Sequence, residues 1–199
     1  MLSLAFKCLL IGLLCLSPKA EFRENSINLV PMDPLSPKKI QLSQGDDSPV
    51  NIDITVTNSK IHGLRNAVAT KVNLIGDYVI KGKVLILPIQ GEGKSNITFV
   101  DVTINVDFTG TPVEKDDGAY MKLENFHLHV EPKFIIYKFD NLFNGDKALG
   151  DNMNKFLNEN WKEIHNELRD SVDVALGSVA NDVIHRVFTK YPYAKYFSE

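Results

Sequence analysis

Residues 97–108 read ITFVDVTINVDF, and this stretch decides the fold. Apolar and polar residues alternate along it, as in a strand with one buried face and one face in water. The alternation shifts by one position after Phe99, and the apolar set then runs from Val100 through Val102 to Phe108. Such a shift indicates a β-bulge, which bends a strand. We therefore expect a long strand in a strongly curved sheet.

A second segment, residues 120–130, has the same irregularity. Its apolar positions Met121 and Leu123 are two residues apart, but the next apolar position, Phe126, comes three residues later. The other segments with this alternation are residues 50–56, 68–74, 78–87 and 134–139. Together they predict about six antiparallel strands. Gly91-Glu92-Gly93 predicts a turn between two of them, and the proline-rich residues 22–49 predict an irregular leading segment.

The C-terminal third predicts one long helix. No proline occurs from residue 146 to residue 191, and apolar residues recur there at intervals of three and four. Asn144 and Asp146 are candidate N-caps, and Pro192 marks the end. An unbroken helix of this length would measure roughly 70 Å. The domain is therefore expected to be elongated, or the helix to bend near Gly177.

The first twenty residues, MLSLAFKCLLIGLLCLSPKA, have the three-part layout of a secretory signal peptide. A membrane-spanning helix needs about 20 apolar residues, and the apolar run here is far shorter. We therefore expect secretion and no stable membrane anchor. Both cysteines, Cys8 and Cys15, lie in this segment. The mature domain, residues 21–199, would then lack thiols, which excludes cysteine catalysis and cysteine-zinc sites.

Catalytic and nucleic-acid-binding chemistry find little support. The sequence has no G-x-S-x-G elbow, phosphate-binding loop or H-E-x-x-H motif, so we expect no enzyme and no cofactor. Without Lys7 and Lys19, the mature chain keeps 20 of the 22 basic residues and has 25 acidic ones. This net negative charge argues against binding of nucleic acid. His127 and His129 alternate with inward apolar residues and are predicted to be solvated. His165 and His185 are placed on the polar flank of the helix, and no metal site is predicted.

Three further segments carry a resemblance. They are GDYVIKGKVLILPIQGEGKSNITFVDVTINVDFTG (residues 76–110), NLFNGDKALGDNMNKFLNENWKEI (residues 141–164) and RVFTKYPYAKYF (residues 186–197). From residue 31 to the end, the chain resembles the insect takeout and haemolymph juvenile-hormone-binding family. The resemblance implies an α+β fold in which a strongly curved antiparallel sheet, a super-roll, wraps a long helix. It also implies secretion, no catalysis and an internal tunnel for terpenoid or fatty-acid-like ligands.

The chain departs from the family at its N-terminus, where it lacks the closing helix and the cysteine pair that the resemblance would imply. Two functions therefore stay open. The first is a secreted, monomeric carrier of an apolar or amphipathic small molecule. The alternative is a shortened, non-binding isoform that acts as a secreted interaction protein.

Candidate ligand contacts are the apolar residues expected on the inner face of the sheet and helix. They are Val72, Leu74, Val84, Ile86, Ile104, Val106, Phe126, Leu128, Ile136, Phe156 and Trp161. The indole N–H of Trp161 is an additional candidate donor to a ligand oxygen. Asn96-Ile97-Thr98 is an N-glycosylation sequon, expected just after the glycine turn.

Overall fold

The computed structural model describes residues 34–45, 48–63, 69–190 and 192. The predicted signal peptide, with Cys8 and Cys15, lies outside these residues. Five strands form one antiparallel sheet in which each strand pairs with the next along the chain. They are β1 (Lys39–Ser43), β2 (Val50–His62), β3 (Ala69–Val84), β4 (Leu87–Lys115) and β5 (Gly118–Phe139).

The sheet curls where single Asn or Asp residues adopt a left-handed backbone, a conformation these two residue types tolerate well. The β2–β3 register shifts beside Asn58 (φ 48°), and the β4–β5 register shifts opposite Asn125 (φ 51°). The second shift lies where the sequence predicts a bulge between Leu123 and Phe126. In β4 the change of face occurs at Asp101 (φ 49°), and pairing resumes there without a register shift. The strongly curved antiparallel sheet is thus confirmed.

Two predicted strand boundaries were wrong. Residues 68–74 and 78–87 do not form two strands: β3 runs through Gly76, and the hairpin turn falls at Leu85 and Ile86. Residues 120–130 and 134–139 form the single strand β5. The leading segment also holds a strand that the sequence did not predict, β1.

Gly91-Glu92-Gly93 lies inside β4 and is not a turn. A Cβ at Gly91 would lie 2.8 Å from the Tyr78 hydroxyl and 2.9 Å from Cα of Leu142. A Cβ at Gly76 would likewise lie 2.7 Å from Cγ1 of Val56. All three distances are shorter than real Cβ contacts, so these glycines permit close packing of neighbouring elements and do not reverse the chain.

The helical region consists of η1 (Phe143–Gly145), α3 (Lys147–Glu159) and α4 (Trp161–Lys190). Asp146 caps α3 as predicted, because its carboxylate accepts from the Leu149 N–H at 3.0 Å. The break lies at Asn160, whose side chain donates to the Phe156 carbonyl at 2.8 Å. Of the two alternatives that the length of the helical region predicts, an elongated domain or a bend near Gly177, the first is observed, and α4 continues through Gly177.

Helix α3 covers the free edge of β5 with two asparagine side chains. The amide of Asn154 bonds both backbone groups of Phe139, and that of Asn158 bonds both backbone groups of Tyr137, at 2.8–2.9 Å. Four helical residues rise about 6 Å and two strand residues advance about 6.8 Å, so the two spacings match closely. The amides therefore pair an edge that would otherwise be open.

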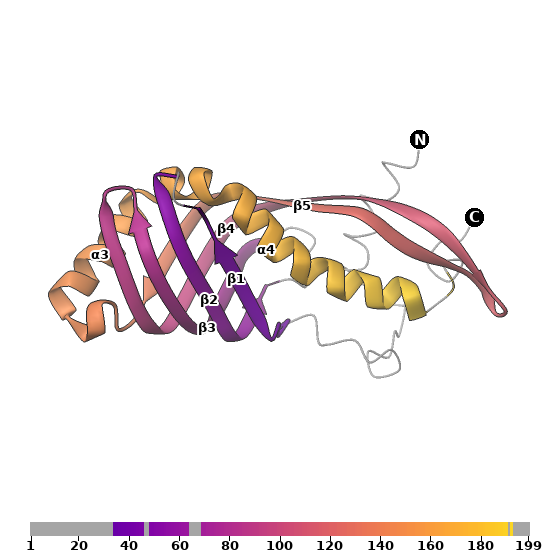
Figure 1. Cartoon of the computed structure of the whole chain (residues 1–199), viewed down its shortest axis with the longest axis horizontal. Helices are drawn as coiled ribbons and strands as arrows, with labels where there is room; N and C mark the ends of the chain where they lie inside the picture. The colour runs from indigo at the N-terminus through magenta and orange to yellow at the C-terminus, as the bar shows by residue number, and fades with distance from the viewer. Residues whose placement is uncertain (1–33, 46–47, 64–68, 191, 193–199) are drawn as a thin grey trace.

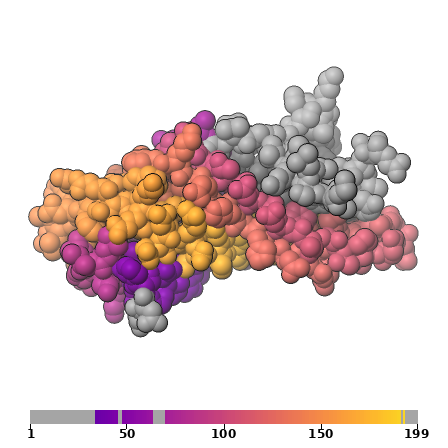
Figure 2. Space-filling model, turned by 90° about the horizontal axis from the view of Figure 1, so that it is seen from above, coloured from indigo at the N-terminus to yellow at the C-terminus, as the bar shows by residue number. Residues whose placement is uncertain are grey.

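Helix α4 lies along the curled sheet, and the molecule is elongated (Figure 1). The end of the β4–β5 hairpin projects beyond the other strands (Figures 1 and 2). The buried core lies between the sheet and the helices and includes Val50, Tyr78, Leu157 and Phe99. None of the described helices combines the length and the apolar composition that crossing a membrane requires.

Candidate ligand-binding cavity

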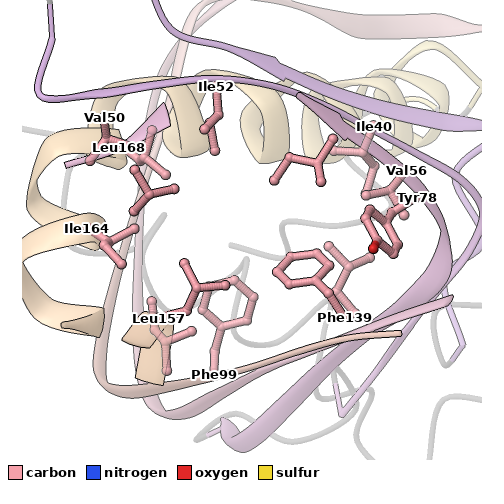
Figure 3. Close-up of a cluster of buried hydrophobic side chains, with 14 of the residues drawn as sticks. Ile40, Val50, Ile52, Val56, Tyr78, Phe99, Phe139, Leu157, Ile164 and Leu168 are labelled. Atoms are coloured by element: carbon pink, nitrogen blue, oxygen red, sulfur yellow. The ribbon is translucent and has the colours of Figure 1, made fainter. Parts of the chain in front are cut away.

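An apolar cavity lies between the curled sheet and the helices. The space open to the centres of water-sized molecules is about 100 Å³, several times the roughly 10–15 Å³ that one water needs. Labelled side chains from the strands and both helices point toward this shared interior in Figure 3. The lining residues that the structure describes are Ile40, Leu42, Ile52, Ile54, Val56, Leu74, Ile80, Val84, Ile89, Ile97, Phe99, Ile135, Tyr137, Phe139, Leu157, Ile164, His165, Leu168, Val172, Ala175 and Leu176.

The sheet wall follows from the two-residue period of strands, because alternate side chains point to one face. Ile52, Ile54 and Val56 of β2 all line the cavity, as the alternation in residues 50–56 suggests. Ile80 and Val84 of β3 continue the same wall. The helical wall follows the three- and four-residue spacing of the α4 stripe. The cavity is therefore built from regular elements.

Two lining residues carry polar atoms, His165 and Tyr137. His165 is 4% exposed, and its Nε2 has no hydrogen-bond partner in the part of the chain that the structure describes. Burial lowers the pKa of His165, and the nearby Arg169 lowers it further. Burial also raises the pKa of the Tyr137 phenol. Both side chains are therefore neutral at neutral pH.

A group of charged residues lies where β5 meets α4. Nδ1 of His129 lies 2.6 Å from a carboxylate oxygen of Asp173, and Nε2 lies 3.1 Å from Glu131. The other Asp173 oxygen accepts from the Val130 N–H at 3.0 Å. Arg169 donates to Glu131 at 3.3 Å. The bond to Asp173 is the main cause that raises the pKa of His129.

The structure places two of the predicted contacts, Leu74 and Val84, in the cavity wall. Val72 is buried in the same core but does not line the cavity. Leu128 and Phe156 are half-buried against that core, again outside the lining. These three residues therefore belong to the core around the cavity without lining it.

The other predicted contacts lie elsewhere. Ile86 is 85% exposed because it occupies the β3–β4 turn, and Ile136 is 42% exposed because Ile135 and Tyr137 face inward instead. The ring of Trp161 packs edge-on against Phe134 at 5.2 Å and does not reach the cavity. Ile86 and Ile136 therefore do not face the interior as predicted, whereas Trp161 is half-buried against the core outside the cavity lining.

Ile104, Val106 and Phe126 also lie outside the cavity wall. They belong to the paired β4–β5 segments beyond the cavity, where Phe126 stacks on Phe108 at 6.2 Å. The long strands continue past the part of the sheet that curls around the helix. A residue whose place in the strand alternation points it inward therefore need not line the cavity.

Three polar residues also differ from expectation. His129 is not simply solvated, because it pairs with Asp173, whereas His127 is exposed. His165 is not on a polar flank. Asn96 follows no turn; it is half-buried within β4, opposite Ile75, and its glycosylation stays a prediction. No group of three or more His, Cys, Asp or Glu side chains in the described ranges is arranged to hold a metal ion.

His165 is the functional candidate that sequence reasoning missed, although a signal for it existed. It lies four residues after Trp161 and three before Leu168, in the middle of the apolar stripe of the helix. The β1 residues Ile40 and Leu42 were missed as well, because the surrounding prolines masked a short strand.

Comparison with known proteins agrees with this architecture. The haemolymph juvenile hormone binding protein (JHBP) family matches residues 24–75 and 69–198. The circadian clock-controlled protein daywake of Drosophila melanogaster is 24% identical, with 79% of this chain and 70% of that protein covered. Its Drosophila yakuba counterpart is 23% identical, with 78% and 69% covered.

The fold is also found in a solved structure. Takeout 1 of Epiphyas postvittana superposes with a TM-score of 0.72 at 22% identity, and the match covers 86% of each chain. It shares the curled antiparallel sheet and long helix, so the predicted takeout-like fold is confirmed. Because the family match extends over most of the sequence, the chain belongs to the haemolymph juvenile hormone binding protein family.

Proposed function

We propose that this protein is a secreted carrier that reversibly binds an apolar or amphipathic small molecule, terpenoid or fatty-acid-like, in the cavity between the sheet and α4. The single observation that carries the proposal is the nearly continuous apolar wall around an internal space. Apolar pockets with few polar groups suit lipid-like ligands. Membership of a family named for binding a juvenile hormone supports the same class of ligand.

The binding free energy expected from burying a short apolar chain is consistent with reversible binding. Burying one methylene contributes about 0.8 kcal/mol, so about eight methylenes would contribute roughly 6 kcal/mol. This corresponds to a dissociation constant on the order of tens of micromolar, before the cost of immobilising the ligand. Additional contacts, including a hydrogen bond, would tighten it.

The proposal includes secretion and the absence of catalysis. Secretion is supported by the signal-peptide layout of residues 1–20 and by the haemolymph location in the family name. Non-catalytic binding is supported by the cavity wall itself, because its described lining residues include no Asp, Glu, Lys or Arg. The cavity favours the carrier over the non-binding interaction protein.

Native mass spectrometry of the full chain expressed in insect cells tests the proposal. The expected spectrum contains a bound lipid-like mass, or acquires one when dodecanol or dodecanoic acid is added. A protein that stays ligand-free and takes up neither compound contradicts the carrier function and favours the interaction protein.

A further inference from the structure

His165 is a polar group in a place where polar groups are rare. The side chain lines the cavity, is 4% exposed, and leaves Nε2 without a hydrogen-bond partner among the described residues. Its neighbours in the helical wall are Ile164, Leu168 and Val172. Most buried polar atoms in native proteins are paired, and an unpaired one calls for a partner absent from the structure.

The charged side chains near His165 pair with one another, although Nε of Arg169 is buried and has no hydrogen-bond partner among the described residues. From β5, Glu131 pairs with Arg169 of α4, and His129 pairs with Asp173 of α4. None of these four side chains lines the cavity. Burial and Arg169 both lower the pKa of His165, so its ring is neutral at neutral pH. A neutral imidazole has one nitrogen that donates and one that accepts a hydrogen bond.

We propose that Nε2 of His165 binds the single polar oxygen of the ligand, so that the cavity selects an apolar chain bearing a neutral hydroxyl, ester or ketone group. This inference rests on the proposed carrier function. It adds a ligand class, because neither a pure hydrocarbon nor a charged head group would match the site. The hydrocarbon leaves Nε2 unpaired, and a carboxylate finds no Lys or Arg in the described wall.

The imidazole also has a fixed position along the cavity. It lies on the same face of α4 as Leu168 and Val172, one and two turns further along the helix. An oxygen bound at His165 would therefore let the rest of the ligand extend beside the apolar stripe toward Leu176. One polar contact then fixes the orientation of an otherwise featureless chain.

Displacement of the fluorescent apolar dye N-phenylnaphthylamine tests the inference. The competitors are dodecane, dodecanol, methyl dodecanoate and dodecanoate, added to the full chain and to its His165→Leu and His165→Gln variants. We expect the wild-type protein to bind dodecanol or methyl dodecanoate about tenfold more tightly than dodecane, the effect of one net hydrogen bond. His165→Leu should remove this preference while retaining dodecane, and His165→Gln should restore part of it.

The possible failures are distinguishable. If the wild-type protein binds neither dye nor any competitor, the carrier function and the inference both fail. If it binds all compounds but does not prefer the neutral oxygen, or prefers dodecanoate, only the role of His165 fails. The same holds if a folded His165→Leu variant keeps the preference.

A measurement on the unmodified protein covers the case in which His165→Leu does not fold. The ¹⁵N resonance of His165 Nε2 should shift when dodecanol or methyl dodecanoate is added and should stay in place with dodecane. An equal response to all three, or no response while the dye is displaced, overturns the inference.

Discussion

The side-chain amide of Asn158 pairs with both backbone groups of Tyr137. Its nitrogen donates to the Tyr137 carbonyl and its oxygen accepts from the Tyr137 N–H, each at 2.8 Å. Because Tyr137 lines the cavity, this pairing on the edge of β5 also holds one wall of the binding site in place. A helix side chain here makes the backbone hydrogen bonds that a neighbouring strand makes elsewhere in the sheet.

Replacing Asn158 with Leu should destabilise the protein by about 1–3 kcal/mol, because it leaves two half-buried backbone groups unpaired. The matched control is Asn152→Leu, an exposed position in the same helix, expected to change stability by about ±0.5 kcal/mol. Urea unfolding followed by circular dichroism measures both. Equal midpoints for the two variants would show that the edge pairing contributes nothing.

The His129–Asp173 pair predicts a pH-dependent contribution to stability. The raised pKa of His129 means that the folded state favours the protonated ring. The contribution is therefore fully present below the unfolded pKa of about 6.5 and is lost as pH rises through the folded pKa. Since His129 is 40% exposed, it should amount to less than about 1 kcal/mol.

The measurement compares the free energy of unfolding of the wild-type protein and His129→Gln at about pH 5.5 and about pH 8.5. The difference between the two proteins should be larger at the lower pH. His165, whose pKa is lowered, has the opposite pH dependence but is present in both proteins and largely cancels. A difference that grows with pH would contradict the pairing.

Ile164→Asp tests whether the sheet closes on the helix. Ile164 is 2% exposed and lines the cavity, so the substitution would bury an unpaired carboxylate at a cost of several kcal/mol. We expect aggregation or loss of secretion from insect cells. Glu163→Ala, at the exposed neighbouring position, should change stability by about ±0.5 kcal/mol. Similar yields and melting temperatures for the two variants would refute the packing described here.

The parts of the fold that periodicity specifies were predictable. Alternation in residues 50–56 and the helical stripe each identify one buried face. The curl of the sheet followed both from the phase shifts in residues 97–108 and 120–130 and from the family resemblance. Apolar runs were ambiguous because a period of two cannot be read from them. In Phe134-Ile135-Ile136-Tyr137 every side chain is aliphatic or aromatic, and the inward set proved to be Ile135 and Tyr137 instead of Ile136. In Leu85-Ile86-Leu87 the same ambiguity concealed a turn.

The site was less predictable because it depends on where the sheet stops curling. Val106 and Phe126 belong to long strands, but only pairing and curvature show that these segments extend past the cavity. His165 was misplaced for a different reason. A histidine is usually assigned to the polar side of an amphipathic helix, and here tertiary packing buries it among apolar residues.

The most direct test of the central claim fills the cavity and measures binding. Ala175 lines the cavity, whereas Ile86 is an exposed turn residue outside it, so Ala175→Phe and Ile86→Phe are a matched pair. Fluorescence titration with N-phenylnaphthylamine should give unchanged affinity for Ile86→Phe and at least about tenfold weaker binding for a folded Ala175→Phe. Equal affinity of both variants and the wild-type protein would contradict a ligand site between the sheet and α4.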